Sequence, residues 1–253
     1  MPGLQVQVPC EVVFDIYTTK KRAFQTPQVD GLDVAALRPV EKIEAPERFG
    51  RNVSPALGIP DPAPEALEVL LKATYVYRVR FTSREPGSLN YLAHAIKTAE
   101  SLAKAVHGVV RDVHTGLIFT ADGLRRVLKS NEYRISDHVL THAVAEPDGR
   151  GLWVHTHGLV KFGRPDLEAR SVPVAFEALT GLGLLAVGDY LSRGNVLSVH
   201  ETVELGTGVI CVSGTRMTAV ESFPAGLLTL DDFDPMTRTP LVGLTRWIAS
   251  ATR

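Results

Sequence analysis

Residues 137–168 read DHVLTHAVAEPDGRGLWVHTHGLVKFGRPDLE, and the interpretation of the chain starts from this stretch. Two alternating, mostly apolar runs flank residues 146–151, which are rich in Pro, Asp and Gly. Alternation on both sides of such turn residues predicts a β-hairpin. Four of the chain's eight histidines lie here, so several groups able to bind a metal or transfer protons converge in one place.

The register of this hairpin follows from its turn. If Ala145 pairs with Leu152, His142 lies opposite His155. Opposed side chains have Cβ atoms about 5 Å apart, and side chains two positions apart on a strand lie about 6.6 Å apart. His142, His155 and His157 would then form a triangle on one face, able to close on one Zn²⁺. A shift of one residue would move His142 to the opposite face and abolish the site.

Composition limits the classes of function. The length fits one large domain or two small ones. The formal net charge of −1 lacks the positive excess of a nucleic-acid binder, so no nucleic-acid partner is expected. Cys10 and Cys211 form no C-x-x-C pair, which argues against a disulfide framework or a thiolate zinc site. No apolar run is expected to reach the roughly 18 residues of a membrane span, and no signal peptide is evident. The expected location is the cytoplasm, without a membrane partner.

Patterns along the chain predict an α+β fold. Residues 74–82 and 109–120 have strand patterns, and residues 91–107 form a helix with one apolar stripe. We expect these strands to share one mostly antiparallel sheet with hairpin strands 139–145 and 152–160, and helices to pack on one face as in a two-layer sandwich of ferredoxin-like elements. Further helices are expected at 64–72, 122–129, 173–190 and 241–251, and further strands at 4–17, 198–204 and 209–221.

The segment from residue 45 to residue 64 contains five prolines. Proline disfavours helix interiors and central strands. We therefore expect residues 1–65 to be an N-terminal strand plus a Pro-rich wrap or linker, and residues 66–253 to form the main α+β domain.

The segment GLWVHTHG, residues 151–158, resembles metal-binding strands of known families. It is similar to the H-x-H strand of JAMM metalloproteases, although Pro165 and Glu168 stand where that family has a serine and an aspartate. It also resembles half of the cupin motif, since Gly149 precedes His155 by six residues. An H-x-H strand beside a strand with a third histidine is similar to α-carbonic anhydrases. These resemblances imply a metal held by histidines, and the JAMM resemblance implies Glu168 as a further ligand.

Residues 155–168 also resemble a run, H-T-H-G-L-x-x-F-G-x-P-[DE]-L-E, of uncharacterised bacterial proteins. This resemblance implies no known activity, but it does imply one structural corner. We expect a turn at residues 163–166, after which Glu168 returns close to His155 or His157.

Three interpretations of the histidines stay open. In the first they are half-buried strand residues with structural hydrogen bonds, and Asp166 and Glu168 form ion pairs with Arg164 or Arg170. In the second they bind a metal. In the third, His155 or His157 is an acid–base group without metal.

The metal interpretation assigns His142, His155 and His157 as Zn²⁺ ligands, with one position open for water. The catalytic general base would be Glu168, or Glu146 at the turn, with Asp166 as the next choice. Because metal binding requires neutral imidazoles, affinity is expected to fall as the pH drops through roughly 6.5.

The favoured function is a non-enzymatic protein-interaction or assembly module, because the sequence has no complete catalytic constellation. Its expected partner is another protein or a second copy of the chain. The alternative is a zinc-dependent hydrolase built on the hairpin. No cofactor other than Zn²⁺ is indicated.

Overall fold

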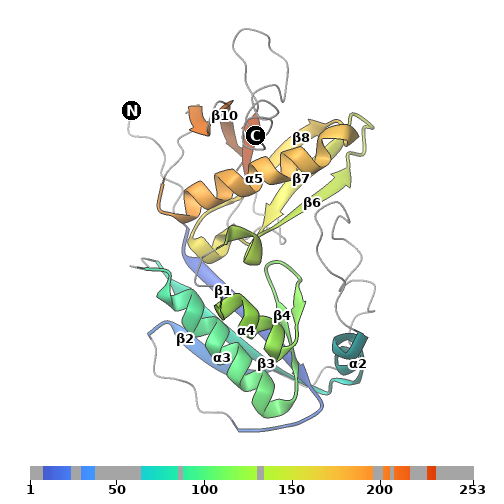
Figure 1. Ribbon diagram of the computed structural model, residues 1–253, viewed down its shortest axis with the longest axis vertical. Helices are drawn as coiled ribbons and strands as arrows, with labels where there is room; N and C mark the ends of the chain where they lie inside the picture. Colours follow the sequence, from blue (N-terminus) through green and yellow to red (C-terminus); the bar gives the residue numbers. More distant parts are fainter. Residues whose placement is uncertain are drawn as a thin grey trace. The chain divides into compact units, whose positions relative to one another are not determined.

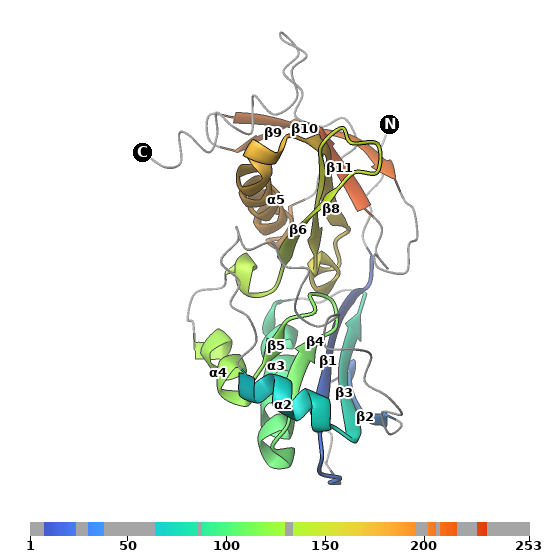
Figure 2. The same cartoon turned by 90° about the vertical axis from the view of Figure 1, so that its right-hand side faces the viewer.

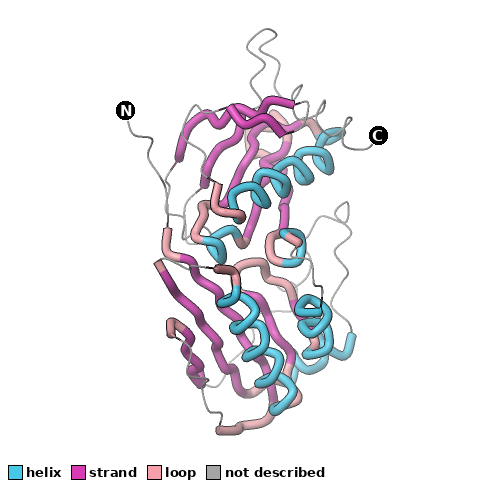
Figure 3. Tube along the Cα trace, turned by 60° about the vertical axis from the view of Figure 1, so that its left-hand side comes forward, coloured by secondary structure: helices cyan, strands magenta, loops and turns pink. Residues whose placement is uncertain are grey.

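The computed structural model describes residues 8–23, 30–37, 64–84, 88–129, 134–195, 202–205, 208–216 and 227–231 (Figure 1). These residues divide into two compact units. The N-terminal unit contains the described residues from Pro9 to Lys129. The C-terminal unit contains those from Arg134 to Asp231, together with Val8. In each unit helices lie beside the strands of a sheet, which confirms the predicted α+β class (Figure 3).

The N-terminal unit is built on an antiparallel sheet of described strands in the order β2-β3-β1-β4-β5. The central strand β1 (Cys10–Thr18) lies between β3 (Tyr75–Ser83) and β4 (Val109–Asp112). The outer strands are β2 (Leu32–Leu37) and β5 (Ile118–Phe119). All but one residue of β1 are buried, so this N-terminal strand is part of the core.

Helices lie on both faces of this sheet (Figure 2). On one face, Tyr91 of α3 (Asn90–Val106) stacks on Phe81 with ring centroids 4.8 Å apart. On the other, α2 (Pro64–Lys72) packs against Val76. Val76 and Phe81 are an odd number of positions apart on β3, which puts their side chains on opposite faces. The sequence predicted helices on one face only, as α3 alone would give, but α2 covers the opposite face.

The prediction that strands 74–82 and 152–160 share one sheet is wrong. Both edges of β3 are occupied, by β1 on one side and by β2 on the other, so the hairpin has no edge of β3 to pair with. The division at residue 65 also differs from the structure, because β1 and β2 belong to the same sheet as β3. Within the described residues, the chain passes from one unit to the other between Val8 and Pro9 and again between α4 (Ala121–Lys129) and Arg134.

The C-terminal unit has a mixed sheet of described strands in the order β6-β7-β8-β11-β10-β9. The predicted hairpin is present as β6 (Leu140–Ala145) and β7 (Leu152–His157). β8 (Asp166–Val172), which the sequence patterns did not predict as a strand, pairs antiparallel with β7 and parallel with β11. The remaining strands are β9 (Thr202–Leu205), β10 (Gly208–Arg216) and β11 (Leu227–Asp231).

One face of β6, β7 and β8 is covered by α5 (Glu177–Ser192). A Cβ atom at Gly188 would lie 3.3 Å from the Leu159 side chain, so glycine permits a close approach of this helix. By length and composition alone, the helical segment Val174–Ser192 could cross a membrane, which corrects the expectation that no run is long enough. In the structure its buried residues pack within the unit.

The helices expected at 64–72, 91–107, 122–129 and 173–190 are all present with shifts of a few residues at their ends. The helix expected at residues 241–251 and nearly all of the Pro-rich segment at 45–64 lie outside the described residues.

Candidate metal centre

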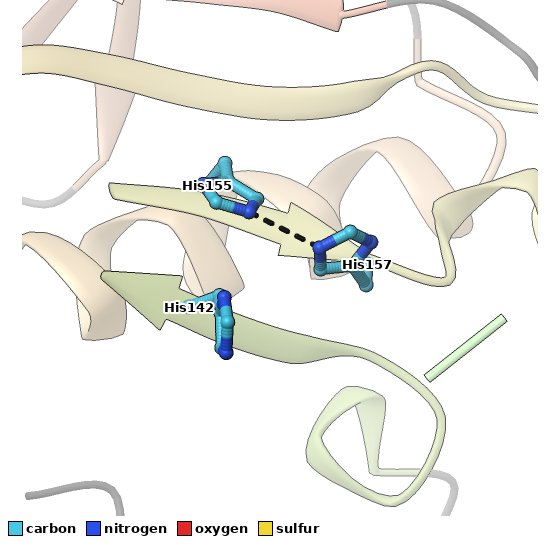
Figure 4. A group of neighbouring side chains, drawn as sticks. All are labelled: His142, His155 and His157. Atoms are coloured by element: carbon cyan, nitrogen blue, oxygen red, sulfur yellow. Dashed lines mark hydrogen bonds between the residues drawn. The ribbon is translucent and has the colours of Figure 1, made fainter. Parts of the chain in front are cut away.

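The β6–β7 hairpin has the register that its turn predicts. Ala145 lies opposite Leu152, and His142 lies opposite His155. His157 follows His155 by two positions, so all three imidazoles share one face. Figure 4 shows the three rings gathered on the side of these strands turned away from α5.

The ring nitrogens are close to the spacing that one metal ion requires. His155 Nε2 and His157 Nε2 are 3.1 Å apart. Two nitrogens bound to a tetrahedral Zn²⁺ at about 2.0–2.1 Å would be about 3.3–3.4 Å apart. One nitrogen from each of His142, His155 and His157 lies within 4.8 Å of the other two, so closure needs movements of at most about 1.5 Å. The cluster could therefore hold a metal ion.

Burial keeps these imidazoles neutral. It is the main cause that lowers the pKa of His155 to about 3, with further contributions from the charges of His157, His142 and Arg170. Burial, and then the charge of His142, lowers the pKa of His157 to about 4. Burial also lowers the pKa of His142. At neutral pH each ring is therefore uncharged and has one nitrogen with a free lone pair. His155 Nε2 and His157 Nε2 form a hydrogen bond, so one of them carries the hydrogen and must pass it to the other nitrogen of its ring before both Nε2 atoms can bind one metal.

The Glu168 carboxylate and the Trp153 ring pack beside the histidine cluster, next to His155. Glu168 lies opposite His155 on β8 and is 1% exposed. Its Oε2 accepts hydrogen bonds from Trp153 Nε1 at 2.7 Å and from Arg170 Nε at 2.9 Å. The Trp153 ring stacks on His155 with centroids 4.0 Å apart and an interplanar angle of 28°. Arg170 lies over the indole, its Cζ 4.4 Å from the ring centroid. The prediction that Glu168 returns to the histidines is confirmed, and so is its ion pair with Arg170.

Asp166 occupies a different environment, in the corner that follows β7. Its Oδ1 accepts hydrogen bonds from Thr156 Oγ1 at 2.9 Å and from the Leu159 backbone N–H at 3.1 Å. Thr156 Oγ1 in turn accepts from the Leu167 N–H at 2.8 Å. Burial raises the pKa of Asp166 to about 7, although these hydrogen bonds oppose the shift. The contacts of Asp166 thus fix the end of β7, next to His157.

Glu146 is held at the other end of the hairpin. Its Oε2 accepts hydrogen bonds from the backbone N–H and the hydroxyl of Ser171, at 3.2 and 3.1 Å. Its Oε1 lies 3.7 Å from Arg170 Nη1. This carboxylate ties the hairpin turn to the end of β8.

Sequence patterns did not single out Lys161. Lys161 is fully buried, and its Nζ donates a hydrogen bond to the backbone carbonyl of His138 at 2.7 Å. Its charge opposes the rise in the pKa of Asp166. A lysine inside the apolar run LVKF, between Gly158 and Gly163, was the available signal.

No protein-family model, curated protein or solved structure matches the chain. The resemblance of residues 155–168 to uncharacterised bacterial proteins thus stays a prediction, and the function of the site is inferred from its own geometry.

Proposed function

We propose that the chain binds a divalent transition metal ion, most suitably Zn²⁺, through His142, His155 and His157. The observation that supports this most strongly is the convergence of three imidazoles on one sheet face, with two Nε2 atoms 3.1 Å apart. Nitrogen ligands of this kind suit Zn²⁺, Cu²⁺ and Ni²⁺. Three protein ligands with a fourth position open are the usual arrangement of a catalytic zinc.

The surroundings of the rings favour binding as well. Neutral imidazoles bind metal without first losing protons, and all three ligands lie on paired strands, which hold side chains more accurately than loops do. Trp153, stacked on His155 and hydrogen-bonded to Glu168, restricts the orientation of one ligand. Partners of this kind around ligands usually strengthen metal binding.

The reaction class that such a centre would support is hydrolysis. A bound Zn²⁺ lowers the pKa of its water towards about 7, which supplies a nucleophile at neutral pH. Among the chain's own residues, Glu168 would orient Trp153 and neutralise Arg170, and Asp166 would hold the corner after β7. We therefore propose positioning roles for both carboxylates in place of the general-base role expected from the sequence.

Calorimetric titration of the full-length, untagged and metal-stripped protein with Zn²⁺ tests the proposal. One equivalent should bind, and His142→Ala, His155→Ala and His157→Ala should each weaken binding strongly. His94→Ala is the matched control, because His94 is exposed on α3 of the N-terminal unit. Absence of Zn²⁺ uptake by the wild type, or uptake that all three substitutions leave unchanged, would contradict the proposal.

A second candidate is the assembly module expected from the sequence, with a second copy of the chain as its partner. The supporting observation is the outer side of the α5 region, where Val174 is 70% and Leu182 is 50% exposed. Light scattering after size exclusion should then give a dimer for the wild type and a monomer for Leu182→Ser. A monomeric wild type would contradict it without bearing on the metal.

A further inference from the structure

We propose that the ligand at the metal's fourth position is a small oxyanion, a carboxylate or a phosphate. This inference rests on the proposed metal site and names the class of molecule that the site takes.

The charge of the ligand set is the first step. His142, His155 and His157 contribute no negative charge as neutral ligands, so a divalent ion would keep its full charge of about +2. His155 is 3% exposed, which limits how far water can screen that charge. Charge in a partly dehydrated site is costly unless an opposite charge accompanies it.

The carboxylates near the cluster supply only part of that opposite charge. Glu168 lies opposite His155, but its Oε2 accepts from Arg170 Nε at 2.9 Å and from Trp153 Nε1 at 2.7 Å. Arg170 also lies 3.7 Å from Glu146. The two carboxylates and the one guanidinium carry a net charge of −1, so about one positive charge of the metal stays uncompensated.

An external anion would complete the balance. His142 and His157 are only half-buried, so a small ligand can approach the cluster from their side. Oxygen is a normal ligand atom of Zn²⁺, at about 2.0–2.2 Å. Carboxylates and phosphates share the oxygen donor and the negative charge, and both are small enough in their simplest forms.

The test uses the full-length protein loaded with Co²⁺, whose visible spectrum reports the number and type of its ligands. Acetate and inorganic phosphate are titrated separately at constant ionic strength, with perchlorate as the inert salt. A saturable spectral change with either anion supports the proposal, and the two arms show which oxyanion is preferred. A Co²⁺ spectrum that neither anion alters would overturn this inference alone. Absence of Co²⁺ uptake would overturn the metal site as well.

Charge variants sharpen the test because their expected effects are opposite in sign. Glu168→Gln removes a negative charge near the metal and should tighten anion binding roughly three- to tenfold. Arg170→Gln removes a positive charge and should weaken it by a similar factor, whereas Arg170→Lys should retain wild-type affinity. Effects in the same direction for Glu168→Gln and Arg170→Gln would overturn the proposal.

Arg125→Gln is the matched control for loss of an arginine. Arg125 pairs with Glu100 at 3.1 Å in the N-terminal unit, and its side chain is 48% exposed against 42% for Arg170. Anion affinity should be unchanged in this variant. All titrations are made with the metal site saturated, so that altered metal affinity does not enter the result.

Discussion

Glu168 and His155 lie opposite each other on β8 and β7, and the indole of Trp153 links them. The indole donates its N–H to Glu168 at 2.7 Å and stacks on the imidazole at 4.0 Å. One carboxylate therefore acts on a candidate metal ligand through an aromatic ring. Substitutions in this contact can therefore test the environment of the histidines whether or not a metal is bound.

Glu168→Gln should lower the free energy of unfolding by about 1–3 kcal/mol, because it breaks a partly buried, charge-assisted hydrogen bond to Arg170. Urea unfolding measures this loss. Glu100→Gln is the matched control, since Glu100 pairs with Arg125 nearer the surface, and it should cost less than about 1 kcal/mol. Equal stabilities for wild type and Glu168→Gln would contradict a structural role for this carboxylate.

Stability should fall as the pH drops below roughly 6.5, the pKa of an ordinary imidazole. The pKa values of His155 and His157 are lowered to about 3 and 4 in the folded state, against roughly 6.5 when unfolded. Between the folded and unfolded pKa values the unfolded chain binds more protons than the folded chain. The stability that comes from keeping these rings neutral is therefore complete above pH 6.5 and is lost on acidification. Each histidine should contribute a loss of about 1–2 kcal/mol between pH 7 and 5.

The pH dependence of these histidines is isolated by comparison with His155→Gln, in which the loss between pH 7 and 5 should be smaller than in the wild type. The comparison is needed because Asp166 acts in the opposite direction. Its raised pKa, about 7, gives stabilisation that is present below about 3.8 and lost as the pH rises through 7. Identical slopes for wild type and His155→Gln would contradict the lowered pKa.

Zn²⁺ affinity should resist mild acid, which revises the fall through roughly 6.5 expected from the sequence. Three ordinary imidazoles would lose about a thousandfold in affinity between pH 7 and 5.5, because all three would protonate. The lowered pKa values of His142, His155 and His157 should limit the loss to less than about tenfold. Calorimetric titrations at the two pH values measure the difference, and a loss near a thousandfold would contradict the description of the rings as buried and neutral.

Trp153 should report metal binding through its fluorescence. Because its ring stacks on His155, Cu²⁺ at the cluster should quench its emission. The chain has one other tryptophan, Trp247, which lies outside the described residues. Trp153→Phe should abolish the saturable quenching, whereas Trp247→Phe should retain it. Saturable quenching that survives Trp153→Phe would place the metal elsewhere.

The histidine triangle could be predicted from the sequence because each step is local. Turn residues fix the pairing of Ala145 with Leu152, and alternation then places the three rings on one face. The site's neighbours on β8 could be predicted only in part. The sequence indicated that Glu168 returns to the histidines, but it left Arg164 and Arg170 as alternative ion-pair partners, and in the structure Glu168 pairs with Arg170. Their position also depends on an irregularity in the β7–β8 register between Leu152 and Val154, which no local pattern signals.

The division into two sheets was beyond local patterns for a related reason. The sequence pattern identifies β3 and the hairpin as strands. Which strands pair, however, depends on which other strands occupy the edges of each one. β2 is a short strand, LDVAAL, close to the expected Pro-rich segment, and it completes the second edge of β3. Because the sequence pattern does not identify LDVAAL as a strand, it leaves one edge of β3 free and predicts a single sheet.

X-ray absorption at the zinc edge of the full-length protein tests the central claim most directly. The account predicts three imidazole nitrogens at about 2.0–2.1 Å, one further light atom and no sulfur. The number of imidazoles should fall from three to two in His142→Ala. A zinc-free protein after incubation with Zn²⁺, or a spectrum with sulfur or with fewer than three imidazoles in the wild type, would contradict the account.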